Sequence, residues 1–403
     1  MSHQHSHGHS PHSHGHSHSH APFPHSHSPP PPYPPQPPSE DQQHPPDLTE
    51  AQHQAGVTAT FDLYRQAALS ANQRRRADYF NLPQLHRDLL PGYIDLLRDV
   101  DERIQVNAQF VAKCIENNPF PPPEDAALDA PAPTEADHER LRSTLRQCVR
   151  DWSEGGKHER EATYTPILEA LQSRFANLSS SERAQTKVLV PGAGLGRLAW
   201  EVVRAGFTCQ ANEFSLHMLI ASAFLLNACS RPSEHALHPY IHSFSNTRTR
   251  EDLLEPCYVP DVDPNEIADG EADFSFAAGD FLELYGEGTG AGDWDACITC
   301  FFIDTARDIV AYLRTIHHLL KPGGTWINCG PTLWHFENDR EASSIELTLE
   351  DVKGLARRVG FEIEEEREIQ TSYTSDRRSL LTHTYTAAFW VARKVDPPVS
   401  SSS

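Results

Sequence analysis

The sequence predicts an α/β protein, in which a mostly parallel sheet with an antiparallel edge hairpin follows a helical region and a disordered tail. Three observations favour this fold class. Apolar residues recur at helical spacing in the first half, short apolar strands alternate with amphipathic helices after Thr186, and a glycine-rich turn follows the first strand. We therefore expect four segments: a tail at 1–47, a helical region at 48–180, a sheet domain at 181–395 and a disordered end at 396–403.

Composition excludes several classes of function. A net charge of -22 argues against a nucleic-acid partner, because phosphate binding needs a concentrated basic face. No apolar run approaches the roughly 20 residues of a membrane-spanning helix. The eight cysteines are scattered and no signal peptide is visible, so we expect reduced thiols in the cytoplasm, with the nucleus as a further compartment. A homo-oligomer is compatible with the sequence.

The tail at 1–47 alternates histidine with serine and glycine up to His27, and prolines dominate from Pro29 to Pro46. Such a segment has almost nothing to bury and should be disordered. Its histidines could bind Zn²⁺, Ni²⁺ or Cu²⁺ loosely, but they have no apolar shell that would impose a geometry. We therefore favour a passive tail and expect no metal site.

The region at 48–180 reads as helices separated by loops. The proline-rich stretch at 118–134 is expected to be a linker or a long loop. Helical periodicity predicts helices over Thr49–Phe80, after Pro91-Gly92, over Glu135–Trp152 and over Tyr164–Phe175.

After Thr186 the sequence pattern changes from helices alone to a β-α-β unit. A buried strand at 187–190, a glycine turn at 191–196, a helix at 197–205 and a strand at 208–211 follow one another, as in an open parallel sheet. The alternation continues with a strand at 294–302, a helix at 306–320, a strand at 325–328, and an antiparallel pair at 361–369 and 384–392.

Ligands of such sheets bind at the carboxyl ends of the strands, where the strand order reverses. The glycine turn lies there. Glu213 stands at the end of the second strand, about 20 residues after the first glycine of the turn, a spacing suited to a ribose diol. Asp280 and Phe281 suit an adenine, because a carboxylate can accept from the exocyclic amine beside an aromatic ring. The third glycine, Gly196, comes one residue too early for a dinucleotide fingerprint.

The segment Leu320-Lys321-Pro322-Gly323-Gly324 looks like the L-x-P-G-G turn of class I methyltransferases, which bind S-adenosylmethionine on a Rossmann-like sheet. Longer strings resemble the carnosine N-methyltransferase family, from about residue 50 to 395. They are 149–153, 190–201, 212–215, 299–306 and 334–338. The resemblance implies transfer of a methyl group from S-adenosylmethionine to an imidazole nitrogen of carnosine (β-alanyl-L-histidine) or a related histidine dipeptide.

The same resemblance implies a set of site residues. Near Tyr385 this chain departs from the family, because it has His383-Thr384-Tyr385 where the family tends to have a run of tyrosines. The preference among dipeptides is therefore open. The dipeptide would be held by Asp304, His335, Tyr373 and Tyr385. The cofactor would be held by Gln147, Arg150, Gly192, Glu213, Asp280, Phe281 and Cys300.

Asp304 is the expected catalytic residue, because its carboxylate could accept the N–H of the non-attacking ring nitrogen and stabilise the developing imidazolium. Asp304 could instead cap the following helix, His335 could be structural and Tyr385 could be core. Cys297 and Cys300 have a C-x-x-C spacing, but on a strand they would face opposite sides, so we expect Cys297 in the core.

Two alternatives for the function remain open. One is a methyltransferase of the same fold that acts on a protein histidine or on another small amine. The other is a non-catalytic, methyltransferase-like scaffold that binds partners.

Overall fold

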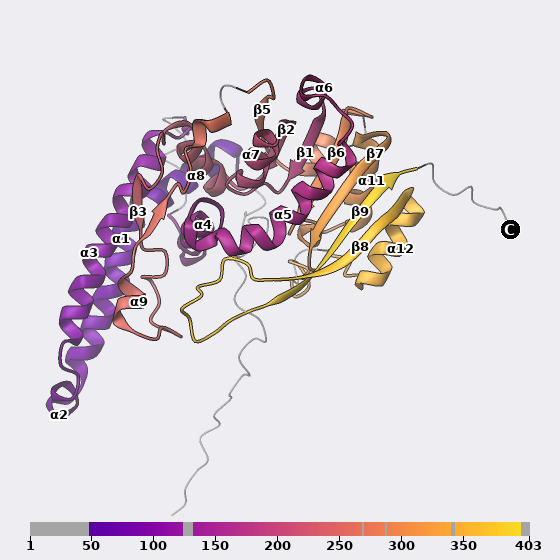
Figure 1. The fold of residues 1–403 in the computed structure, drawn as a ribbon. Helices are drawn as coiled ribbons and strands as arrows, with labels where there is room; N and C mark the ends of the chain where they lie inside the picture. Colours follow the sequence, from indigo (N-terminus) through magenta and orange to yellow (C-terminus); the bar gives the residue numbers. More distant parts are fainter. Residues whose placement is uncertain (1–47, 124–131, 268–269, 287, 340–342, 396–403) are drawn as a thin grey trace, which may run out of the picture. The chain divides into compact units, whose positions relative to one another are not determined.

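The structure is a computed structural model that describes residues 48–123, 132–267, 270–286, 288–339 and 343–395 (Figure 1). The two expected disordered ends, at 1–47 and 396–403, lie outside the described residues, as does part of the expected linker. None of the helices in the described ranges is long and apolar enough to cross a membrane.

A seven-stranded sheet organises the second half of the chain, in the order β5-β2-β1-β6-β7-β9-β8. Neighbours from β5 to β7 run parallel, whereas β9 runs antiparallel to both β7 and β8. The expected mixed sheet with an edge hairpin is therefore confirmed. The strands are β1 (Lys187–Pro191), β2 (Thr208–Glu213), β5 (Phe274–Ala278), β6 (Trp294–Cys300), β7 (Leu320–Gly330), β8 (Phe361–Thr371) and β9 (Tyr385–Lys394).

The strand order reverses between β1 and β6. From β1 the chain continues outward to β2 and β5 on one side, while β6 and β7 extend the sheet on the other side. The carboxyl ends of β1 and β6 therefore lie next to each other at the position where such sheets bind ligands.

The helical region packs onto the sheet domain through one shared core. Trp152 donates a hydrogen bond from its indole Nε1 to the carbonyl of Leu195 (3.0 Å), and its ring meets Trp200 edge-on at 5.9 Å. The boundary expected at residue 180 remains a prediction. The helices of this region are α1 (Glu50–Asn81), α2 (Gln84–Asp88), α3 (Tyr93–Glu116), α4 (Glu135–Trp152), η3 (Glu154–Gly156), α5 (Lys157–Arg174) and α6 (Ser180–Ala184).

Helix α5 begins seven residues before the start at Tyr164 that hydrophobic periodicity predicts. Its first two turns contain Glu159 and Arg160, which are buried in hydrogen bonds and ion pairs rather than in apolar packing. A pattern search that counts apolar residues cannot detect a helical face of this kind.

The remaining elements connect the strands. The helix expected at 306–320 is shorter, because it starts at Ile309 with Asp308 as its N-cap, and β7 already begins at Leu320. These elements are α7 (Arg197–Arg204), α8 (Leu216–Asn227), β3 (His235–Leu237), α9 (Arg250–Leu254), β4 (Cys257–Val259), η4 (Pro264–Ile267), α10 (Phe281–Tyr285), η5 (Ile303–Thr305), α11 (Ile309–Leu319) and α12 (Leu349–Val359).

Candidate active site

The glycine turn after β1 adopts a backbone that requires glycine. Gly192, Gly194 and Gly196 have φ values of 63°, 56° and 78°, in the left-handed region that other residues rarely adopt. A Cβ on Gly192 would lie 2.4 Å from Cδ2 of Phe302. A side chain at this position would therefore collide with Phe302, so only glycine lets the turn pack this closely.

Glu213, at the end of β2, is bound to that turn. Its Oε2 accepts a hydrogen bond from the backbone N–H of Gly194 (2.7 Å), and its Oε1 accepts from the N–H groups of Phe214 and Ser215 (both 2.9 Å). Glu213 also lines a cavity at the reversal point of the sheet, where the hydroxyls of a ribose are expected. The carboxylate thus has two functions, to hold the turn and to face the cavity.

Asp280 and Phe281, at the start of α10, line the same cavity as Glu213. Oδ1 of Asp280 caps α10 by accepting from the N–H groups of Leu282 and Glu283, at 2.8 and 3.0 Å. The ring of Phe281 is 3% exposed and packs edge-on against Phe302 with a centroid distance of 5.4 Å. This pair lines the wall where an adenine is expected.

A cavity of about 250 Å³ opens at the reversal point of the sheet. A smaller cavity of about 40 Å³ adjoins it, and Gln147, Gly192 and Tyr373 line both. Of the other expected site residues, Glu213, Asp280, Phe281 and His335 line the larger cavity, and Arg150 and Cys300 line the smaller one.

Asp304 and Tyr385 do not line either cavity, but they lie directly behind residues that do. The carbonyl of Asp304 accepts from the N–H of His335 (3.1 Å), and the ring of Tyr385 meets Phe301 edge-on at 5.6 Å. The charge of Asp304 also helps to raise the pKa of Tyr385, after burial. The structure therefore brings all the expected residues into one region.

The carboxyl group of Asp304 is buried, and only one of its two oxygens accepts a hydrogen bond. Its side chain is almost inaccessible, Oδ2 accepts from the N–H of Leu333 (3.0 Å), and Oδ1 has no hydrogen-bond partner. Burial raises its pKa to about 7, although the bond from Leu333 acts in the opposite direction. The alternative role as a helix cap is wrong, because Asp308 caps α11. A buried carboxylate with an unused oxygen is suited to receive a polar hydrogen from a ligand.

His335 and Tyr385 could each have a purely structural role, His335 as a structural histidine and Tyr385 as a core residue. Burial lowers the pKa of His335 to about 4, so the ring is neutral near pH 7. Tyr385 is only partly buried at the start of β9, which contradicts the alternative that it is a core residue. A neutral His335 can orient a polar group of the acceptor by donating or accepting a hydrogen bond.

Arg150 connects the helical region to the small cavity. Its Nη1 donates to Asp151 (2.9 Å) and to the hydroxyl of Tyr164 (2.8 Å), and its guanidinium lies 4.7 Å from the centroid of the Tyr373 ring. Gln147 donates to the other oxygen of Asp151 (3.0 Å). Sequence reasoning missed Asp151 and Tyr164 as partners of these residues, because nothing in their local sequence indicates an ion pair with Arg150.

The two cysteines of the C-x-x-C spacing have different environments. Cys297 is fully buried in the core, as expected, whereas Cys300 is partly exposed to the small cavity. A hydrogen bond with Cys329, together with the charge of Arg150, lowers the pKa of Cys300 despite burial.

One group of possible metal ligands occurs among the described residues, away from these cavities. Cys229, Glu234 and His235 place their ligand atoms within 4.8 Å of one another. The ammonium of Lys113 lies near enough to lower the pKa of His235, after burial. That positive charge would compete with a cation.

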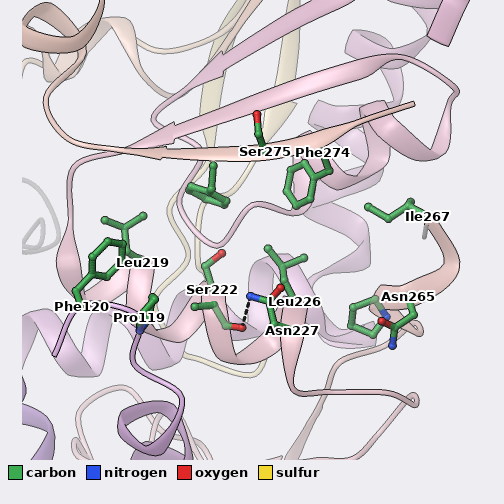
Figure 2. Close-up of a pocket in the computed structure, with 13 residues that line it drawn as sticks. Pro119, Phe120, Leu219, Ser222, Leu226, Asn227, Asn265, Ile267, Phe274 and Ser275 are labelled. Carbon is green, nitrogen blue, oxygen red and sulfur yellow. Dashed lines mark hydrogen bonds between the residues drawn. The ribbon is translucent and has the colours of Figure 1, made fainter. Parts of the chain in front are cut away.

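A second cavity, of about 410 Å³, lies on the other face of α8, between that helix and the edge strand β5 (Figure 2). None of the expected site residues lines it. Met218 faces the candidate active site and its neighbour Leu219 faces this second cavity, so α8 separates the two.

Comparison with known proteins identifies the family to which the chain belongs. The family described as carnosine N-methyltransferase matches residues 129–396. A carnosine N-methyltransferase of Mus musculus is 40% identical over 89% of this chain and 90% of its own length. The Schizosaccharomyces pombe protein of that name is 38% identical over 84% of this chain and 94% of its own. Both matches extend through the helical region as well as the sheet.

Proposed function

The chain belongs to the carnosine N-methyltransferase family, and on this premise we propose that it methylates an imidazole nitrogen of carnosine, giving anserine. Related dipeptides that contain histidine are further acceptors of the same kind. The observation that carries the proposal is the unpartnered, buried Oδ1 of Asp304 behind the cavity that the glycine turn, Glu213 and Asp280 enclose.

The residues at the cavity fit S-adenosylmethionine, which the family uses. The left-handed glycine turn lines both cavities, Glu213 lines the larger one where a ribose diol is expected, and Asp280 has a second oxygen for an exocyclic amine. Gln147, Arg150 and Cys300 would hold the remainder of the molecule from the small cavity. When bound, this cofactor supplies a methyl group on a sulfonium sulfur, which needs no metal.

On the acceptor side, the imidazole must present a free lone pair on one nitrogen. Asp304 Oδ1 accepts the N–H of the other nitrogen, which selects that tautomer and offsets the positive charge that the ring gains during transfer. His335 and the tyrosines Tyr373 and Tyr385 orient the polar groups of the dipeptide. Alignment and exclusion of water then account for most of the acceleration.

The test is a methylation assay with carnosine, free histidine and a histidine-containing peptide, each analysed by mass spectrometry. We expect methylcarnosine as the main product, with turnover that a chelator leaves unchanged. Preferential methylation of the peptide would favour a protein histidine as acceptor. Titration calorimetry without detectable S-adenosylmethionine binding would instead support a non-catalytic scaffold and overturn the proposal.

A further inference from the structure

Glu159 is a buried carboxylate that the reaction described above does not use. It lies on α5 and is 2% exposed, yet the hydrogen bonds of its carboxylate go to a segment more than 200 residues later. Oε1 accepts from the hydroxyl of Ser372 (2.7 Å) and from the N–H of Ser375 (3.0 Å), and Oε2 accepts from the N–H of Thr374 (2.9 Å). One side chain therefore holds three polar residues that flank Tyr373, one before it and two after it.

These residues begin the long connection between β8 and β9, drawn in yellow in Figure 1. Thr374 has a φ of 48°, a left-handed conformation that is uncommon for a residue other than glycine. Such a conformation persists only where the surroundings impose it. The bond from the Thr374 N–H to Glu159 is a contact that can impose it.

Tyr373, which lies inside this anchored segment, lines both cavities of the candidate active site. Its ring lies 4.8 Å from that of Phe301 and under the guanidinium of Arg150. The position of the ring therefore depends on where the backbone at 372–375 is held.

Glu159 also lies 3.7 Å from Nε of Arg150, so it could simply balance that charge. However, Arg150 already donates to Asp151 and Tyr164, whereas both oxygens of Glu159 accept from the loop. Burying a carboxylate costs free energy unless its hydrogen bonds are made. The geometry favours the loop as the main partner of this carboxylate.

We propose that Glu159 is a positioning residue, which fixes the segment 372–375 so that the Tyr373 ring forms the acceptor side of the cavity. The inference rests on the proposed function only for the identity of the acceptor. Its two consequences are an anchored backbone, measurable without substrate, and a lower KM for the acceptor, measurable only in turnover.

The first variant is Glu159→Gln, which keeps the size of the side chain but leaves only one accepting oxygen for three donors. We expect the KM for carnosine to rise about tenfold, as for the loss of one or two buried hydrogen bonds, with kcat and S-adenosylmethionine affinity changed less than threefold. Glu161→Gln, at an exposed position two residues later on α5, is the matched control and should change neither. Ser372→Ala, which removes a single donor, should raise the KM by a smaller factor and serves as the test if Glu159→Gln does not fold.

A double variant separates positioning from general stability. If Glu159 acts through Tyr373, adding Glu159→Gln to Tyr373→Ala should raise the KM no further. The inference would be overturned if Glu159→Gln raised the KM by the same factor in the wild type and in Tyr373→Ala. An unchanged KM in both Glu159→Gln and Ser372→Ala would overturn it as well.

Amide hydrogen exchange distinguishes a failure of this inference from a failure of the proposed function. The amides of Thr374 and Ser375 should exchange at least tenfold faster in Glu159→Gln than in the wild type or in Glu161→Gln, because their acceptor is weakened. If the wild type does not methylate carnosine, the proposed function fails, and the exchange result still decides whether Glu159 anchors the loop. Unchanged exchange at both amides would contradict the anchor itself.

Discussion

The cofactor side and the acceptor side of the candidate active site are built in different ways. On the cofactor side, Glu213 is 19 residues from the Gly194 N–H that it accepts, and Asp280 accepts from residues two and three positions later. On the acceptor side, Asp304 and Glu159 reach partners 29 and more than 200 residues away. The carboxylates that follow β2 and β5 are thus held by short segments, whereas Asp304 and Glu159 depend on contacts between distant parts of the chain.

The carboxylates of Glu213 and Asp304 also differ in how well their oxygens are satisfied. Both oxygens of Glu213 accept hydrogen bonds from the protein, whereas Asp304 keeps one buried oxygen without a partner and a raised pKa. An unsatisfied buried group costs free energy, which a bound ligand can recover. We infer that the acceptor side carries the chemical discrimination, and the following predictions test this comparison.

The largest effect is expected for Asp304→Asn. An amide can still accept the imidazole N–H but cannot offset the developing charge, so turnover should fall by roughly 10²–10³-fold. S-adenosylmethionine affinity, measured by calorimetry, should stay within about threefold, because Asp304 lies behind the acceptor side. Asp308→Asn, a change at the N-cap of α11, is the matched control, since asparagine caps a helix as well as aspartate does. Near-normal turnover in Asp304→Asn would remove its catalytic role.

A change on the cofactor side should weaken cofactor binding more than it affects the acceptor. Glu213→Ala should weaken S-adenosylmethionine binding by about 1.5–3 kcal/mol, the range for a charge-assisted hydrogen bond. The KM for carnosine at saturating cofactor should change much less. An unchanged cofactor affinity in a folded Glu213→Ala protein would exclude Glu213 from the site and weaken the division into two sides.

The raised pKa of Asp304 predicts a pH dependence. Below about pH 7 its carboxyl group becomes protonated and loses the charge that stabilises the imidazolium. The acceptor imidazole, with an ordinary pKa of about 6.5, also becomes protonated and loses its lone pair. The plot of log kcat/KM against pH should therefore approach a slope of about 2 at low pH in the wild type and about 1 in Asp304→Asn. Equal slopes in the two proteins would show that Asp304 does not titrate in this range.

The smallest effect is expected for deletion of residues 1–47. The segment has no apolar face to dock, and the deletion leaves Thr49, whose side chain caps α1. Turnover should stay within about twofold and the Tm within about 2 °C of the wild-type values. A loss of turnover that added zinc restores would contradict the passive role of the tail.

The local signals of the sequence predicted helices and strands alike, since α1 and α4 begin and end within one residue of their expected bounds, whereas β7 begins five residues before its expected start at Thr325. The apolar strands and the glycine turn are recognisable because a parallel sheet buries both faces of its strands. The first turns of α5 were missed, and so were Asp151, Tyr164 and Glu159. All of these depend on buried polar contacts, which have no periodicity of their own.

By itself, the sequence determined the order of the strands along the chain, the left-handed glycine turn and the acid that follows β2, because each depends on neighbouring residues. The resemblance to the family then identified the expected site residues one by one. Only the tertiary structure decided that Asp304 is buried with a free oxygen rather than used as a cap, and that Glu159 holds the segment around Tyr373. Burial and long-range hydrogen bonds are properties of segments that meet only after the chain has folded.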